Sequence, residues 1–350
     1  MARVLNVPRS AHIAGLEWLG PEIQYSRTQD GQAVRGDTFP MTWAADGEIY
    51  ASCGDPCWGP SVWGLDVEKL SGFPPDYAIT QVNPMSDYAG WGGWGPKPSG
   101  MISVKGVLYL AVQNLRGMKE PARGTKSQHG SDAGIIASRD FGRTWSPDIK
   151  SAFFNIVMFP GSRFGGPAFV NFGRDNDGAR DEYVYAVSTD QWDNGGHLLL
   201  GRVHQDHILE VAAWQWVEEV DDMTGPAWTS DLDRAAAVLS CDRSMSLPEM
   251  VYLRSIGRYL LLTWSLKGDF SGTGGSRLIV YDAPEPWGPF TLAHLEDRWE
   301  AVEMNPYCPR IPLKWMEPDG LGGWLQFSGS WEAGHRYYAS HVRRFRINLR

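Results

Sequence analysis

Apolar and polar positions alternate in short runs that are separated by turns along the whole chain. The clearest runs come in pairs, in which an apolar segment, a Gly- or Asp-containing turn and a second segment rich in Tyr, Leu and Trp follow one another. This pattern is typical of β-hairpins. It predicts five of them, over residues 39–55, 100–114, 167–188, 249–265 and 311–330.

Further alternating segments follow the predicted hairpins, over residues 134–145, 197–216, 276–290 and 336–348. An inner hairpin followed by outer strands, repeated about every 70 residues, is typical of a β-propeller, in which each blade is a four-stranded sheet around a central axis. Five such blades would use the whole chain. We therefore expect an all-β fold, a five-bladed β-propeller that forms one domain over residues 1–350, with residues 1–30 closing the last blade.

Composition and charge narrow the choice of partners. The 17 Trp, 40 Gly and 23 Pro suit short strands joined by tight turns. The net charge of −9, without any Lys/Arg-rich run, argues against nucleic acid as a partner. The chain has neither an apolar run of membrane-spanning length nor the apolar core of a secretory signal, so we predict a soluble protein with no membrane partner. The compartment stays open, because a trimmed leader would leave the same chain.

The sequence gives weak support for a metal. Four cysteines are too few for a disulfide scaffold in a chain of this length, and the CxxxC pair at positions 53 and 57 lacks a second pair at zinc-site spacing. We expect free or incidentally paired thiols and no metal cofactor. The alternating acids Asp175, Asp177 and Asp181 lack the closing Glu of an EF-hand, and structural calcium there is a minority alternative.

The segment RGDTFPMTWAADGEIYASCGD, residues 35–55, suggests a catalytic pair. Asp37 and Asp55 are equidistant from a turn centred on Asp46, so strands over 37–44 and 48–55 would make them cross-strand neighbours. Directly opposed residues have Cβ atoms about 4.5–5.5 Å apart, and the innermost strand of a blade lines the central funnel. When two carboxyl groups lie this close together, their repulsion raises the pKa of one of them. One group is then protonated and the other ionised near neutrality.

A structural interpretation of these acids is also open. Asp55 could begin a turn before Pro56, and Asp37 could bind backbone amides where its strand begins. Asp46 precedes a glycine at the predicted hairpin tip, which is a favoured turn, so we expect its role to be structural.

Aromatic and polar residues in the predicted loops are candidates for substrate binding. Trp faces on Gly-rich loops suit stacking on sugar rings, although each could pack in the core instead. The candidates are Trp58, Trp91, Trp94 and Trp331. Polar candidates lie just before predicted strands, and these are Asp242, Arg243, Tyr307, Arg310 and the weakest of them, His129.

The segment SRDFGRTW, residues 138–145, fits the Asp-box of sialidase-like propellers. The resemblance implies a structural role, in which Ser138 and Asp140 tie a turn and Trp145 packs between blades. Only one box is present, and the early Arg-Ile-Pro signature of sialidases is missing, because Arg310, Ile311 and Pro312 come far too late. A sialidase is therefore disfavoured.

Motifs over about residues 35–331 resemble a family of bacterial propellers once grouped only as a domain of unknown function. They include GDTFPMTWAADGEIYASCGD, FVNFGRDNDGARDEYVY, GRYLLLTW, YDAPEPWGPF and KWMEPDGLGGWLQFSG. The family includes the endo-D-arabinanases of glycoside hydrolase family 183. The resemblance implies a five-bladed propeller that cleaves furanoside or related glycosidic bonds with two aspartates of the first blade, which map onto Asp37 and Asp55. Thr38-Phe39, where an aromatic often follows the Asp, and the segment CGDPC depart from the pattern.

These observations predict a retaining glycoside hydrolase with a carbohydrate substrate of the arabinan or arabinofuranoside type, Asp37 as nucleophile and Asp55 as acid/base. Two alternatives remain. One is a polysaccharide lyase that uses a Tyr or His base with an Arg or a metal, with His129, Tyr307 and Arg310 as its residues. The other is a glycan-binding propeller without catalysis.

Overall fold

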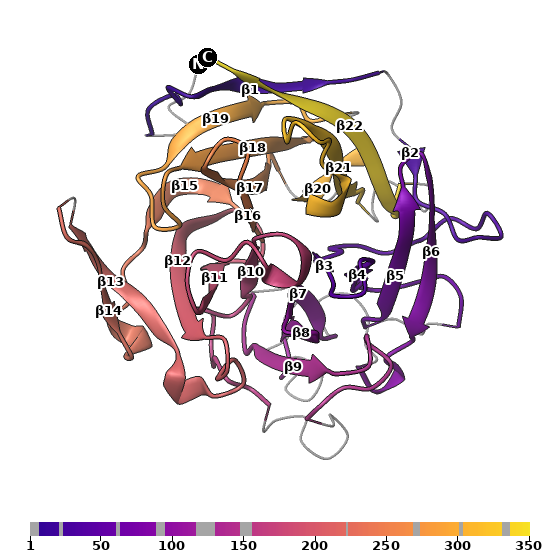
Figure 1. Cartoon of the computed structure of the whole chain (residues 1–350), viewed down its shortest axis with the longest axis horizontal. Coiled ribbons are helices and arrows are strands. Elements are labelled where there is room, and N and C mark those ends of the chain that lie inside the picture. The colour runs from indigo at the N-terminus through magenta and orange to yellow at the C-terminus, as the bar shows by residue number, and fades with distance from the viewer. Residues whose placement is uncertain are drawn as a thin grey trace.

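The chain folds almost entirely into antiparallel strands that surround a common centre (Figure 1). The computed structural model describes residues 7–20, 24–60, 64–88, 95–116, 130–147, 156–221, 223–268, 274–300, 304–330 and 337–350. The strands fall into five consecutive groups, and in each group the first strand in the list below lies nearest to the centre (Figure 1). The predicted all-β propeller is confirmed.

The first two groups follow the two N-terminal hairpins. The first group contains β3 (Met41–Trp43), β4 (Ile49–Ala51), β5 (Val67–Phe73) and β6 (Asp76–Asn83). The second contains β7 (Lys97–Val104), β8 (Val107–Gln113) and β9 (Gly134–Ser138). The turn after β9 is held by Ser138 and Asp140, whose side chains accept hydrogen bonds from the backbone amides of Gly142 (2.7 Å) and Thr144 (2.9 Å).

The third and fourth groups share one sheet, because their innermost strands β10 and β16 pair in parallel. The third group contains β10 (Ala168–Asn171), β11 (Tyr183–Thr189), β12 (Gly195–His204), β13 (Gln215–Asp221), β14 (Gly225–Thr229) and β15 (Leu239–Met245). The fourth contains β16 (Glu249–Leu253), β17 (Arg258–Leu266), β18 (Ser276–Ala283) and β19 (Thr291–Glu296).

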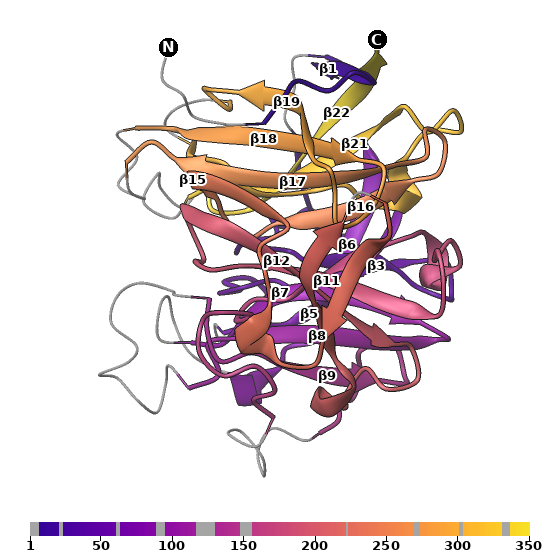
Figure 2. The ribbon, with the colours of Figure 1, turned by 90° about the vertical axis from the view of Figure 1, so that its left-hand side faces the viewer.

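The last group combines both ends of the chain. It contains β20 (Tyr307–Arg310), β21 (Gly322–Ser328), β22 (Ser340–Leu349), β1 (Ile13–Trp18) and β2 (Gln24–Tyr25). Strand β1 pairs with β22 along its length and also contacts β19 of the fourth group, as the edge-on view of Figure 2 makes visible. Residues from the first 30 positions therefore form the outermost strand of this group.

Short 3-10 turns complete the secondary structure: η1 (Ser86–Tyr88), η3 (Arg174–Asn176), η4 (Val211–Ala213), η5 (Leu232–Arg234) and η7 (Leu313–Trp315). The last of these corrects the fifth predicted hairpin, whose first strand was placed from residue 311 onward. The observed inner strand is β20, which ends at Arg310, and the apolar residues after it form η7 instead. Pro312 lacks an amide hydrogen and cannot continue a strand ladder.

The inner strands are buried on both faces, so even their polar residues lie in the interior. Every residue of β7, β10 and β20 is buried. Gly100 in β7 allows the close approach of β10, since a Cβ atom there would lie 2.6 Å from the Pro167 carbonyl oxygen. The hydrophobic clusters lie between neighbouring groups, so each group completes its core against the next.

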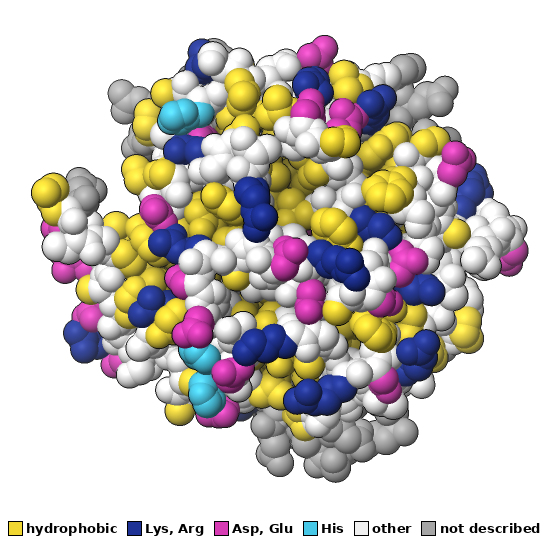
Figure 3. Space-filling view, viewed as in Figure 1, with side chains coloured by type: hydrophobic (Ala, Val, Ile, Leu, Met, Phe, Trp, Pro, Cys, Tyr) yellow, Lys and Arg dark blue, Asp and Glu magenta, His cyan; other side chains and the backbone are white. Residues whose placement is uncertain are grey.

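The surface seen in Figure 3 mixes acidic and basic side chains over the whole face, with apolar side chains between them. In the described part of the chain, helices stay too short and too polar to cross a bilayer.

Candidate active site

The hairpin formed by β3 and β4 brings Asp37 and Asp55 to the same end of the first group, but in a different register from the one expected. Met41 pairs with Ala51 and Trp43 with Ile49, which is symmetric about position 46. Beyond Pro40 the register slips by one residue, and Asp37 pairs with Gly54 through two backbone hydrogen bonds of 2.8 Å. The expected direct pairing of Asp37 with Asp55 is therefore wrong.

The slip has a local cause. Thr38 and Phe39 both have positive φ angles, 64° and 40°, so the strand bulges directly after Asp37. L-residues adopt such angles rarely, and strained backbone of this kind gathers at functional sites. Asp55 also has a positive φ, 45°. The ordered strands β3 and β4 are correspondingly shorter than the predicted 37–44 and 48–55.

Asp37 is a buried carboxyl group in a setting that favours its protonated form. Its side chain is 5% exposed, and Oδ2 accepts a hydrogen bond of 2.9 Å from the Tyr307 hydroxyl. Desolvation, followed by the negative charge of Asp55, raises the pKa of Asp37 to about 7. Lys97 and hydrogen bonds from Tyr307 and Tyr338 act in the opposite direction without cancelling the rise.

The surroundings of Asp55 differ from those of Asp37, because a lysine lies beside its carboxyl group and balances a negative charge there. The Lys97 ammonium lies 2.8 Å from Asp55 Oδ1, and the two side chains are 1% and 4% exposed. An ammonium ion at this distance, shielded from water, favours the carboxylate form. Lys97 begins β7 of the second group, so the ion pair joins two groups.

The sequence reasoning missed Lys97, although a signal was present. Lys97 is a charged residue between two prolines, just before the hairpin predicted over 100–114, and the other polar candidates have the same position relative to a predicted strand. Tyr338 was also missed, and it lies in a segment predicted only as an outer strand.

Tyr307, one of the predicted binding residues, is held by two tryptophans. Its ring centroid lies 5.9 Å from that of Trp192 and 5.4 Å from that of Trp264, and all three side chains are buried. Packing on two sides fixes the direction in which the hydroxyl donates. Tyr307 therefore supports Asp37 from the fifth group.

Arg310 has a bracing role instead of the predicted contact with substrate. Its side chain is 1% exposed, and Nε and Nη1 donate to the backbone carbonyls of Thr38 (3.1 Å) and Pro248 (2.9 Å). The carbonyl of Thr38 belongs to the bulge, so Arg310 stabilises the strained backbone next to Asp37 and joins the first, fourth and fifth groups.

Three further candidates are corrected by their positions. Trp58 is 5% exposed and packs in a core cluster with Phe39 and Leu70, so it is not a loop face open to a sugar. Asp242 and Arg243 lie exposed on β15, which pairs with β12, and not at the start of the inner strand β16. The remaining candidates, Trp91, Trp94, His129 and Trp331, lie outside the described residues.

The acids considered for calcium do not converge. Asp175 accepts hydrogen bonds from Ser103 Oγ (2.6 Å) and the Gly106 amide (3.0 Å), whereas Asp181 accepts them from the Tyr185 hydroxyl and the Tyr183 amide. Among the residues that the structure describes, one group of His, Cys, Asp and Glu side chains could hold a metal, and it contains none of these acids.

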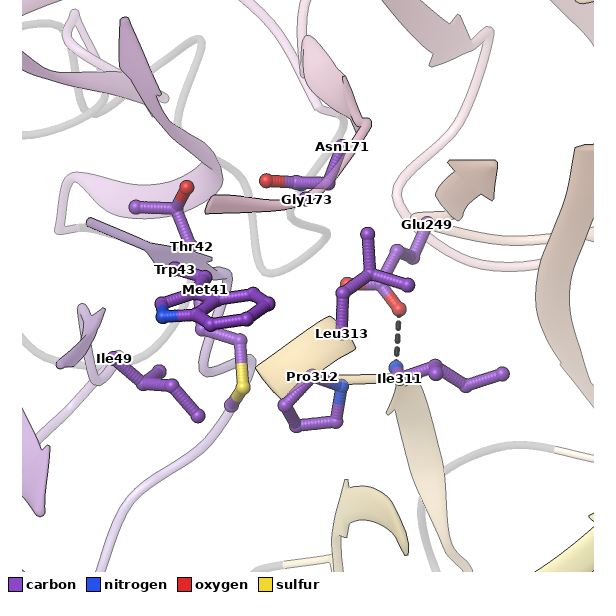
Figure 4. A pocket seen from close by; sticks show the side chains of 10 residues that line it. All are labelled: Met41, Thr42, Trp43, Ile49, Asn171, Gly173, Glu249, Ile311, Pro312 and Leu313. Atoms are coloured by element: carbon purple, nitrogen blue, oxygen red, sulfur yellow. Dashed lines mark hydrogen bonds between the residues drawn. The ribbon is translucent and has the colours of Figure 1, made fainter. Parts of the chain in front are cut away.

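A narrow pocket elsewhere on the inner strands contains another buried carboxyl group. Side chains of β3, β10, β16 and η7 line it (Figure 4), among them Trp43, Asn171 and Glu249. Glu249 accepts a hydrogen bond of 2.5 Å from the Ile311 amide, and desolvation raises its pKa to about 7 despite the charge of Arg310. Neither Asp37 nor Asp55 lines this pocket.

The site at Asp37 therefore holds one carboxyl group that favours its proton and one that favours its charge. Pairs of carboxyl groups whose surroundings separate their protonation states supply a general acid together with a base or nucleophile. Such pairs are the usual machinery for cleaving glycosidic bonds.

The sequence of the chain also matches a known protein family. The family described as "Domain of unknown function (DUF4185)" matches residues 75–312, so the chain belongs to it. Lys97 and Tyr307 lie inside the matched region, whereas Asp37 and Asp55 precede it. No curated protein matches the chain.

Solved structures with a similar fold include carbohydrate-active enzymes. The alpha-L-arabinanase of Cellvibrio cellulosa, complexed with arabinohexaose, is 12% identical, with a TM-score of 0.53 over 91% of this chain and 96% of that one. The alpha-L-arabinofuranosidase PaAbf62A of Podospora anserina, in complex with cellotriose, is 13% identical, with a TM-score of 0.52 over 97% and 99% of the two chains. At these identities the similarity establishes the fold alone.

Proposed function

We propose that this protein is a glycoside hydrolase that acts on a poly- or oligosaccharide of the arabinan or arabinofuranoside type. The observation that carries the proposal is the contrast between the two buried carboxyl groups, Asp37 beside Tyr307 and Asp55 beside Lys97. The fold, which resembles those of an alpha-L-arabinanase and an alpha-L-arabinofuranosidase, supports this choice of substrate class.

The surroundings of the two acids favour roles opposite to those expected from the sequence. Asp37, with a pKa of about 7, carries the proton that the leaving oxygen of the scissile bond needs. Asp55, paired with Lys97, supplies the carboxylate that attacks the anomeric carbon. In the second step Asp37, now ionised, accepts a proton from the water that releases the sugar.

The stereochemical outcome of this mechanism is retention. Carboxyl groups about 5–5.5 Å apart act as nucleophile and acid/base, whereas about 6.5–9.5 Å leaves room for a water and inverts the anomeric centre. Asp37 pairs with Gly54, the residue next to Asp55, and the charge of Asp55 is one of the causes that raise the pKa of Asp37, which supports the shorter separation. Proton NMR of the first product formed distinguishes the two outcomes.

The test is a screen of the purified protein against arabinans, arabinogalactans and uronate-containing glycans, followed by isosteric variants on the substrate found. Asp37→Asn and Asp55→Asn should each lower kcat at least about a thousandfold, because each loses an ionisable group. Asp46→Asn is the matched control. Asp46 binds the Glu48 amide and the Tyr50 hydroxyl at the hairpin tip, and Asn keeps that turn, so activity should persist.

Other outcomes would reject the proposal. A fully active Asp37→Asn or Asp55→Asn variant on a confirmed substrate removes the carboxyl pair from the mechanism. An unsaturated, ultraviolet-absorbing product identifies a lyase. Binding without release of any product identifies a glycan-binding propeller.

A further inference from the structure

Three side chains with metal-binding atoms meet inside the first group, one residue away from the strand position that pairs with Asp37. They are the Cys53 thiol and the carboxyl groups of Asp66 and Glu68, and one ligand atom from each lies within 4.8 Å of the others. All three residues are 0% exposed. A thiol and two carboxyl groups together in the dry interior are unusual in a cytosolic or an exported protein alike.

The strand pairing explains why they meet. Cys53 follows β4, and its backbone exchanges hydrogen bonds with Asp66, through the Asp66 amide (3.1 Å) and Asp66 Oδ1 (3.3 Å). Glu68 lies two residues further along β5 and therefore on the same face of the sheet. It pairs directly with Ala51, whose methyl group leaves that face open for the longer side chain.

Glu68 is the member that points to a missing ligand. Both of its carboxyl oxygens are buried and have no well-formed hydrogen bond with the described residues, and the indole of Trp58 is the donor that approaches them. A buried carboxyl group without well-placed partners is costly, and a bound cation would offset that cost at Glu68.

We propose that Cys53, Asp66 and Glu68 bind a divalent cation of the zinc type. Thiolate sulfur selects zinc-like ions over calcium and magnesium, and carboxylate oxygen is an accepted ligand of the same ions. Three protein ligands leave a fourth position for water. The ion would hold the end of β4, and with it Gly54 and Asp55, against β5.

The CxxxC spacing suggests a different pair of metal ligands, Cys53 and Cys57, from the set that the structure brings together. Cys57 is absent from the cluster, its side chain is partly exposed, and its amide donates to the Arg35 carbonyl at 3.2 Å. Sequence proximity would therefore join Cys53 to the wrong partner, whereas the ladder between β4 and β5 joins it to two acids.

Metal analysis of the protein purified from zinc-supplemented medium tests the proposal. Wild type should retain about one zinc per chain after dialysis, and Glu68→Gln and Cys53→Ser should each lose most of it. Cys241→Ser is the matched control, because Cys241 is also buried but faces the Tyr281 hydroxyl at 3.3 Å and does not belong to the metal-binding cluster found among the described residues. Its zinc content should equal that of wild type.

Cobalt substitution keeps the test independent of how the variants fold. Wild type loaded with Co²⁺ should show the near-ultraviolet charge-transfer band of a cobalt–thiolate bond. Wild type without bound zinc and without this band overturns the proposal, as does zinc content unchanged in a folded Glu68→Gln variant. Both readouts are independent of catalytic activity, so they stand apart from the proposed hydrolase function.

Discussion

At the scale of single residues, neighbours decide what the two active-site acids can do. Asp37 and Asp55 have the same side chain and similar burial, yet one accepts a phenol hydrogen bond and the other faces an ammonium ion. These neighbours come from the fifth and the second group, respectively, so the difference arises only when the ring of groups closes. The same closure positions Arg310 on the carbonyl of Thr38.

The first prediction concerns pH. If protonated Asp37 is the general acid, kcat/KM should fall about tenfold per pH unit above a pKa of about 7. Folding stability should fall at lower pH, between about pH 4 and 7, because a carboxyl group whose pKa is raised in the folded state stabilises that state fully below its unfolded pKa, and this contribution is lost as the pH rises to about 7. The pH–rate profile and denaturant unfolding between about pH 4 and 8 measure both effects.

The comparison with Asp37→Asn isolates this group from the other buried acids. The variant should show a smaller loss of stability between about pH 4 and 7 than wild type, by an amount on the order of a few kcal/mol. Equal pH slopes in the two proteins, or a rate that stays constant above neutrality, would contradict the assignment.

Residue-scale prediction from the sequence was only partly possible. The symmetry of Asp37 and Asp55 about Asp46 was enough to predict that the two acids lie at one end of the hairpin, because an Asp-Gly tip fixes where the chain reverses. It could not reveal the bulge at Thr38 and Phe39, since neither residue type favours positive φ. The position of Lys97 ahead of a predicted strand marked it as a candidate, but its pairing with Asp55 could not be predicted, because the two residues lie 42 positions apart in different groups.

At the scale of elements, the bulge between Asp37 and Pro40 determines the position of Asp37 more than the strand β3 that follows it. It shifts the register by one, so that a glycine and not an aspartate faces Asp37. Side chains and backbone then fill the space at that glycine: a Cβ atom on Gly54 would overlap Asp37 Oδ1 and lie 3.0 Å from Thr38 Oγ1.

The second prediction follows from that crowding. Gly54→Ala should lower kcat at least about tenfold and destabilise the fold by about 1–3 kcal/mol, because the methyl group must displace the Asp37 carboxyl group or the bulge. Gly268→Ala is the control, since an added Cβ there has no neighbour within 4 Å. Kinetics and urea unfolding of both variants give the answer. An active, stable Gly54→Ala protein would show that Asp37 has room to move, and would weaken the argument for a fixed acid.

The prediction of strands was correct where the alternation of apolar and polar residues coincided with a clear turn. It was wrong where prolines interrupted this pattern. The hairpin over 249–265 appears as β16 and β17 in nearly the expected positions, because its strands alternate cleanly around a turn that contains Gly257. The apolar residues after Arg310 also alternate, yet they form η7, because Pro312 breaks the ladder and Trp315 packs against the first group instead.

At the scale of the whole molecule, closure of the ring links the two ends of the chain to the site. Strand β1 covers β22 in the group whose inner strand supplies Tyr307 and Arg310. Each group also completes its hydrophobic core against its neighbours, so removing one exposes the faces of two others. The groups of such a fold stabilise one another, and we propose that the chain is one domain.

The last prediction tests that joint stability. Thermal unfolding should be a single cooperative transition by calorimetry and by Trp fluorescence, with calorimetric and van't Hoff enthalpies in agreement. Ile13→Ala, in β1 and 1% exposed, should lower the free energy of unfolding by about 2–5 kcal/mol and move the whole transition, because the cavity weakens the group that closes the ring. Met223→Ala is the control, since Met223 is 91% exposed and its loss should change stability by less than about 0.5 kcal/mol. Two separated transitions, or a proteolytic fragment that folds alone, would show that the groups form independent units and that β1 stabilises only its own part of the molecule.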